Sequence, residues 1–110
     1  MKPYIDLAEV KKSEGEGKTS YRLLEESHGC VAGCTSGVSY YRSTEYGKPG
    51  IHADQEGFFV ISGSGYAKIG DEEFKVHQGI SFIAPAGTPH TIKRDESCDA
   101  VEVFWFHSSI

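Results

Sequence analysis

Glycine divides the middle of this chain into segments that are too short for a helix of useful length. Four segments rich in apolar residues follow one another at 58–62, 66–69, 72–76 and 80–83. They are separated by Gly63-Ser64-Gly65, by Gly70-Asp71 and by a turn that ends at Gly79. Such segments bounded by turn residues predict strands, and connections this short predict hairpins. We therefore expect an antiparallel meander here, in which 58–62 and 66–69 form the first hairpin.

The flanking sequence continues the pattern of short strands. Further strands are expected at 19–26, 38–43, 91–93 and 100–107. Residues 1–20 are expected to hold a short edge strand at 4–7 and then a solvated, glycine-rich loop at 11–18. With 110 residues and 13 glycines, the chain fits a single domain, 1–110, built from many short strands. The predicted fold class is all-β, as a sandwich or a barrel.

Three side chains near the ends of these strands offer donors for a metal. His52 and Glu56 precede the apolar segment at 58–62, and His90 follows a turn that contains Pro85 and Gly87. Two imidazoles and one carboxylate suit a divalent transition metal such as iron, manganese, nickel or zinc, and they leave coordination positions open. Taken singly, each of these residues is as readily a polar residue on the surface. Their joint spacing is what favours a site.

The segment from Gly79 to His90 resembles a motif of the cupins. Cupins have a second motif of the form G-x5-P-x-G-x2-H-x3-N, and Gly79, Pro85, Gly87 and His90 match it at every spacing. Arg94 replaces the closing Asn. The resemblance is to a small single-domain cupin of the cupin 2 type, and it implies a double-stranded β-helix, or jelly-roll barrel, with its core motifs in residues 47–94.

The first cupin motif, G-x5-H-x-H-x3,4-E-x6-G, is matched more loosely. His52, Glu56 and Gly63 fit its second His, its Glu and its closing Gly. Gly50 stands where the first His belongs, and Thr44 replaces the opening Gly. The resemblance implies that His52, Glu56 and His90 point into the mouth of the barrel as metal ligands.

The missing first histidine leaves three outcomes open. The site binds metal through three protein ligands, or it recruits Asp54 as a further ligand, or it is empty. The first outcome would resemble the two-histidine, one-carboxylate triad of non-haem iron oxygenases. Bound metal would then activate water, polarise a carbonyl group or bind dioxygen.

Two functions from different classes are compatible with these residues. The first is a metal-dependent enzyme, a dioxygenase or an isomerase, acting on a small organic molecule in the barrel. The second is a non-catalytic cupin that binds or senses a small molecule, with a degenerate or empty metal site. Whether the chain is an enzyme stays open at this point. Candidate pocket residues are Tyr40, Arg42, Asp54, Phe58 and Trp105.

Composition limits the partners and the compartment. A formal net charge of −5 gives no electrostatic reason to bind nucleic acid or an anionic membrane. The chain shows neither a signal-peptide pattern nor the ~20 apolar residues of a membrane span, so we expect a cytoplasmic protein. Its 3 cysteines are expected to be reduced thiols. Cys30 and Cys34 have C-x3-C spacing, which is not that of zinc knuckles. We expect them to be small buried residues at a turn.

The strand at 100–107 bears on assembly because both of its faces are apolar. One alternating face carries Val101, Val103, Trp105 and His107, and the other carries Glu102, Phe104 and Phe106. Phe59 and Ile61 make the same case for the strand at 58–62. Because a large exposed apolar patch usually marks an interface, we expect a homodimer formed sheet to sheet. The alternative is that the N-terminal strand of the same chain covers these aromatic residues.

Overall fold

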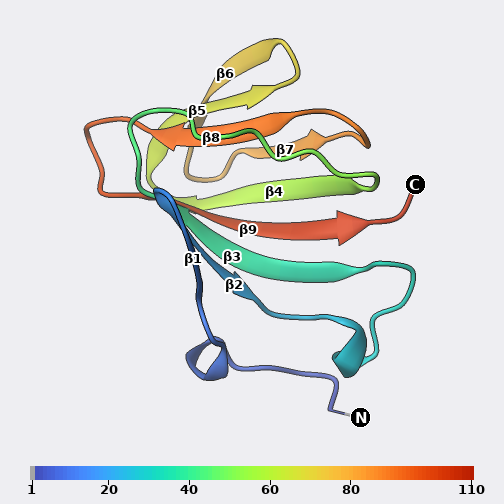
Figure 1. The fold of residues 1–110 in the computed structure, drawn as a ribbon. Helices are drawn as coiled ribbons and strands as arrows, with labels where there is room; N and C mark the ends of the chain where they lie inside the picture. The colour runs from blue at the N-terminus through green and yellow to red at the C-terminus, as the bar shows by residue number, and fades with distance from the viewer. Residues whose placement is uncertain (1) are drawn as a thin grey trace.

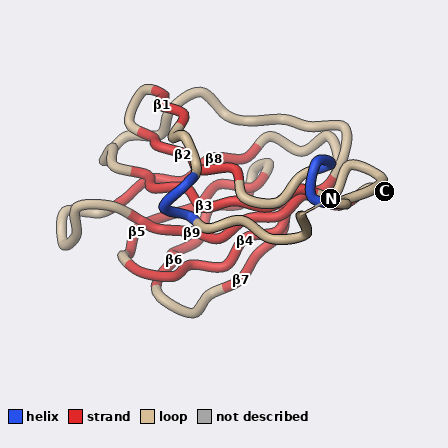
Figure 2. The backbone as a smooth tube through the Cα atoms, turned by 90° about the horizontal axis from the view of Figure 1, so that it is seen from below, coloured by secondary structure: helices blue, strands red, loops and turns tan. Residues whose placement is uncertain are grey.

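The computed structural model describes residues 2–110 and consists almost entirely of strands (Figure 1). The strands are β1 (Ser13–Gly15), β2 (Lys18–Arg22), β3 (Thr35–Tyr41), β4 (Gln55–Ser62), β5 (Ser64–Ile69), β6 (Glu72–His77), β7 (Ser81–Ala84), β8 (His90–Arg94) and β9 (Val101–Ser108). Two single-turn 3-10 helices, η1 (Leu7–Glu9) and η2 (Glu26–His28), are the only helical elements among the described residues (Figure 2). The all-β prediction is confirmed. In residues 2–110, no helix has the length and apolar character that a membrane crossing requires.

The strands form two antiparallel sheets. The larger sheet has six strands in the order β1-β2-β3-β9-β4-β7, and the smaller has three in the order β6-β5-β8. Figure 1 shows β2, β3, β9 and β4 side by side, with β5, β6 and β8 gathered above them. The core therefore lies where inward-facing residues of the two sheets meet.

Alternation along the strands builds this core. Phe58 and Val60 on β4 are almost fully buried, and so are Val101 and Val103 on β9. They pack in one cluster with Ala67, Val76 and Ile92 from the smaller sheet. Full burial of each large side chain is worth about 1.5–3 kcal/mol, so this shared core holds the two sheets together.

The N-terminal segment differs from the prediction. Residues 4–7 do not form a strand, since η1 begins at Leu7 with the Asp6 carboxylate accepting a hydrogen bond from the Ala8 N–H. A strand forms instead inside the expected loop, where β1 pairs with β2 across a two-residue turn. Gly17 provides the positive φ, +69°, in that turn. The polar residues of β1 are tolerated because it is an exposed edge strand.

The prediction of a hairpin between 58–62 and 66–69 is wrong. β4 pairs with β7 and β9, whereas β5 pairs with β6 and β8, so the chain passes from one sheet to the other at Gly63. Gly63 has φ +87°, and a Cβ there would collide with the carbonyl oxygen of Ala100. The next expected turn is confirmed, since Ile69 and Glu72 pair directly across Gly70-Asp71. A short glycine connection thus marks a turn without telling whether the chain stays in its sheet.

Candidate metal centre

Backbone hydrogen bonds bring the three predicted ligands together from separate segments. His52 lies in the loop before β4, Glu56 is the second residue of β4, and His90 is the first residue of β8. Gly50 and His90 form an isolated antiparallel bridge, in which each N–H donates to the other's carbonyl oxygen at 2.9 Å. The Gly87 N–H donates to the His52 carbonyl oxygen at 2.7 Å. These bonds fasten the loop of His52 to the turn and strand that carry His90.

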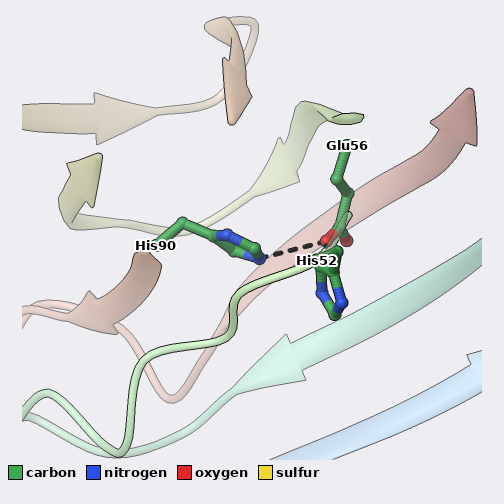
Figure 3. A group of neighbouring side chains, drawn as sticks. All are labelled: His52, Glu56 and His90. Carbon is green, nitrogen blue, oxygen red and sulfur yellow. Dashed lines mark hydrogen bonds and ion pairs between the residues drawn. The ribbon is translucent and has the colours of Figure 1, made fainter. Parts of the chain in front are cut away.

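The side chains of His52, Glu56 and His90 converge (Figure 3). One ligand atom from each lies within 4.8 Å of the other two. The Glu56 Oε1 atom is 3.1 Å from His90 Nε2 and 3.4 Å from His52 Nε2. Two atoms that each bind one metal at about 2.0–2.2 Å are separated by about 3–3.6 Å, so these separations fit a shared ion. The borderline donors and their spacing fit a divalent transition metal, and this group could hold one.

Burial and hydrogen bonding set the state of His90. Burial alone lowers the pKa of its imidazole, but the hydrogen bond with Glu56, the bond with the Thr88 carbonyl and the Glu56 charge outweigh burial and the Lys18 charge, so the pKa is raised. The Thr88 carbonyl oxygen, 3.2 Å from Nδ1, can only accept. Nδ1 therefore carries a hydrogen, and Nε2 is the atom presented to Glu56. This orientation of a histidine by a carbonyl group is typical of metal ligands.

A third imidazole lies beside this group, and it was not predicted as a ligand from the sequence. His107 on β9 is the direct cross-strand partner of Glu56 on β4. Its Nε2 is 3.5 Å from Glu56 Oε1, and its ring centroid is 5.0 Å from that of His52. The signal was present in the alternation of β9, which places His107 on the same face as the buried Val103 and Trp105.

These imidazoles line a cavity of about 910 Å³. Trp105 and Tyr41 contribute aromatic wall, and Ser20 and Ser39 contribute hydroxyl groups. Charged residues of β1, β2 and the neighbouring loops also line it, with both signs present: Lys11, Glu14, Glu16, Lys18, Arg22, Glu45 and Lys48. The group of His52, Glu56 and His90 therefore opens into a cavity large enough for a small organic molecule.

A comparison with protein families identifies the fold family. The family model described as the cupin domain matches residues 39–107. The chain belongs to the cupin family. A search of curated proteins found no match for this cupin.

Solved structures agree with the assignment. The polyketide cyclase RemF from Streptomyces resistomycificus is similar with a TM-score of 0.80 and 16% identity, over 97% of this chain and 79% of that one. A mutant of oxalate decarboxylase OxdC from Bacillus subtilis has a TM-score of 0.82 and 16% identity, over 99% of this chain and 30% of that one. Fe(II)-HppE with an alternative substrate has a TM-score of 0.82 and 15% identity, over 96% of this chain and 59% of that one. The cupin spans 57% of apo-HppE. Identities this low establish the fold alone.

The structure locates the residue that departs from the first cupin motif. A Cβ on Gly50 would lie 3.1 Å from His90 Nε2 and 3.6 Å from His52 Nε2. Position 50 therefore faces the candidate metal ligands His52 and His90, but it supplies no side chain. Asp54 does not take its place in the group, because both of its carboxylate oxygens are 3.1 Å from Nδ1 of His107.

The other predicted pocket residues fall in different places. Trp105 lines the cavity. Phe58 lies in the core, 1% exposed, with its ring stacked on Phe82. Tyr40 and Arg42 line a separate hollow of about 420 Å³. Side chains alternate along β3, so its cavity-lining residues are instead Ser39 and Tyr41.

The three cysteines are free thiols. Burial, together with a hydrogen bond to Cys34, raises the pKa of Cys30. A raised pKa disfavours the thiolate form that attacks substrates or binds metal. Neither Cys30 nor Cys34 lines the cavity beside Glu56.

Proposed function

We propose that this cupin is a metal-dependent enzyme, a dioxygenase or an isomerase, acting on a small organic molecule in the cavity. One observation carries the proposal: two imidazoles and a buried carboxylate converge where the 910 Å³ cavity begins. A carboxylate that is only 7% exposed is costly to bury unless it is paired, and it has no use in a purely apolar pocket. One of the similar structures is an oxalate decarboxylase by name, and another is Fe(II)-HppE with an alternative substrate, which supports the same class.

The protein groups divide the work of such a site. His52, Glu56 and His90 would hold one divalent ion of iron, manganese, nickel or zinc. When bound, the ion supplies a Lewis acid that polarises a substrate oxygen, or a centre that activates dioxygen. Gly50 brings only backbone against the two imidazoles, so no side chain from this position would occupy a coordination place on the ion. The Trp105 indole offers an apolar wall against which a substrate would lie.

Metal content of the purified protein tests the proposal. We expect about one equivalent of a transition metal in the parent and its loss in a His52→Ala/His90→Ala double variant. The metal-loaded protein would then be screened by reaction class, with oxygen consumption for a dioxygenase and proton exchange for an isomerase. Absence of metal after reconstitution would contradict the enzyme proposal.

The second candidate function is a non-catalytic cupin that binds or senses a small molecule. The observation that favours it is Gly50, since a ligand position of the cupin motif has lost its side chain. Tight binding of a small molecule by metal-free protein, with no turnover after metal loading, would select this function.

We also propose that the protein forms a homodimer through the outer face of the larger sheet. Phe59 on β4 and Phe104 on β9 are direct cross-strand partners, 46% and 37% exposed. Phe106 and Ile83 flank Gly57 on the same face and are also exposed. The N-terminal segment, described from residue 2, leaves these aromatic residues exposed. An apolar patch on the outer face of a sheet suits a two-fold contact, in which each copy offers the same patch to the other.

A further inference from the structure

We propose that His107 is a fourth protein ligand of the metal and that Asp54 positions it. The inference rests on the proposed metal site, and it adds to that site an imidazole that neither cupin motif contains. His107 comes from β9, outside the stretch that holds both motifs. It follows from three observations on the geometry around Glu56.

The first observation is the convergence of three imidazole nitrogens on one oxygen. Glu56 Oε1 is 3.1 Å from His90 Nε2, 3.4 Å from His52 Nε2 and 3.5 Å from His107 Nε2. Only the contact with His90 has the geometry of a hydrogen bond. All three separations fall in the range of about 3–3.6 Å expected for atoms that bind one ion. By this measure His107 stands in the same relation to Glu56 as the two predicted histidines.

The second observation concerns the hydrogen on His107. Both carboxylate oxygens of Asp54 lie 3.1 Å from Nδ1, and an ionised carboxylate can only accept. Nδ1 of His107 therefore carries a hydrogen, and Nε2 is the nitrogen that faces Glu56. The Glu56 oxygen at 3.5 Å is also an acceptor. A carboxylate oxygen and an imidazole nitrogen as close as Glu56 Oε1 and His107 Nε2 are stabilised by a cation between them, either a metal ion or a proton.

The third observation is the contact that orients each ring. A metal-binding histidine usually donates its other N–H to a carboxylate or a carbonyl oxygen, which fixes the tautomer. His90 has this partner in the Thr88 carbonyl group, and His107 has it in Asp54. His52 has no such partner among the described contacts, and its side chain is 42% exposed. His107 is thus oriented for metal at least as firmly as His52.

A ligand role for His107 explains the absent side chain at Gly50 and the position of Asp54 together. The chain lacks the first histidine of the cupin motif, yet His107 restores a set of three imidazoles and one carboxylate. The new donor arrives from the strand paired with Glu56 instead of from the loop. Asp54 takes part through His107, as a positioning residue, and not as a ligand.

Cobalt(II), which has a visible spectrum sensitive to its ligands, is a suitable probe. Apo-protein would be titrated with cobalt(II) against a competing chelator, for the parent and for His107→Gln, Asp54→Asn and His77→Gln variants. His77 is the matched control, because it is an exposed histidine at the end of β6 whose ring contacts only the neighbouring carbonyl group of Gln78. Circular dichroism and thermal unfolding would verify that each variant is folded.

We expect His107→Gln to weaken cobalt(II) about 100-fold or more and to change the visible spectrum. Asp54→Asn should weaken it about 10–100-fold, the usual effect of losing a partner that orients a ligand. His77→Gln should match the parent. X-ray absorption on the parent should count three imidazoles, a measurement that needs no variant.

The outcomes separate this inference from the proposed function. Cobalt(II) bound by the parent through two imidazoles, with an unchanged spectrum in His107→Gln, would overturn the role of His107 and leave the three-ligand site intact. In that case the cation between Nε2 and Glu56 would be a proton. Failure of the parent to bind any transition metal would overturn both.

Discussion

Gly50 and His90 are held together by two backbone hydrogen bonds of 2.9 Å, so the position that lacks a side chain is fixed directly against the imidazole of a candidate metal ligand. The contact explains how a loop residue and the first residue of β8 keep a constant spacing. It also makes position 50 a sensitive place to probe the site.

Gly50→Ala should weaken metal binding about 3–10-fold while leaving the fold intact. The new methyl group would lie 3.1 Å from His90 Nε2, which is tight, so the imidazole must move by a few tenths of an ångström. Gly47→Ala is the matched control, because a Cβ there meets nothing within 4 Å. Metal affinity by chelator competition checks the prediction, and equal affinities in the two variants would contradict it.

Ser39→Ala should lower the free energy of unfolding by about 1–3 kcal/mol, since a buried donor is left without a partner. The Trp105 Nε1–H donates to the Ser39 hydroxyl oxygen at 2.8 Å, and Ser39 is 1% exposed. Ser20→Ala removes only the hydroxyl contact at 2.8 Å on the other side of Ser39, so it should cost less, about 0.5–1.5 kcal/mol. Urea unfolding measures the free energy of unfolding of both variants. A larger loss in Ser20→Ala than in Ser39→Ala would contradict the prediction.

Acid should destabilise the protein partly through Asp95. Hydrogen bonds from Ser97 and Ser64 hold the pKa of this carboxyl group below its ordinary value. A folded-state pKa below the unfolded one contributes stability above the unfolded value, about 3.9, and that stability is lost as the pH falls through the folded pKa.

Asp95→Asn should therefore reduce the dependence of unfolding free energy on pH below about 4. Asp71→Asn is the control, because Asp71 is an exposed turn residue with no side-chain hydrogen bond among the described contacts. Urea unfolding from pH 2.5 to 6 compares the three proteins. The same slope for the Asp95 variant as for the parent would count against the prediction.

Phe104→Lys should convert the proposed dimer to monomer. A lysine at the centre of the apolar patch would place a charge in the contact of both copies, and burying an unpaired charge is costly. Light scattering after size exclusion gives the mass. Val31→Lys is the control, since Val31 is 77% exposed and lies outside the patch. A parent that is monomeric at all concentrations would show that the patch serves another purpose.

Metal should raise the free energy of unfolding of the parent by an amount that grows with the logarithm of its excess over the dissociation constant. A ligand at 100 times its dissociation constant adds about 2.7 kcal/mol if it binds the folded state alone. Thermal unfolding with and without cobalt(II) checks this, with His52→Ala/His90→Ala as the control. A rise of equal size in the double variant would place the metal elsewhere.

The sequence predicted the strands well because their cause is local. Alternation and glycine turns defined β3 to β9 to within a few residues. The pairing of β4 was not local. Its neighbours β7 and β9 lie far along the chain, and at Gly63, where the chain changes sheets, the Ala100 carbonyl oxygen leaves no space for a Cβ. No pattern within 58–69 contains that contact.

The candidate site was likewise only partly predictable from the sequence. His52, Glu56 and His90 could be predicted because the cupin motifs record their spacing. The position of His107 depends on the register between β4 and β9, which pairs it with Glu56. Tyr40 and Arg42 failed to reach the cavity for a related reason, since one step along β3 decides which face a side chain takes.

The convergence of donors from both sheets has a consequence for the order of folding. Glu56 belongs to the larger sheet and His90 to the smaller, so the full set of donors exists only after the two sheets have met. Metal bound at that late stage of folding would mainly affect the rate of unfolding. It would slow unfolding by holding the sheets together, and it would leave the rate of their first encounter nearly unchanged.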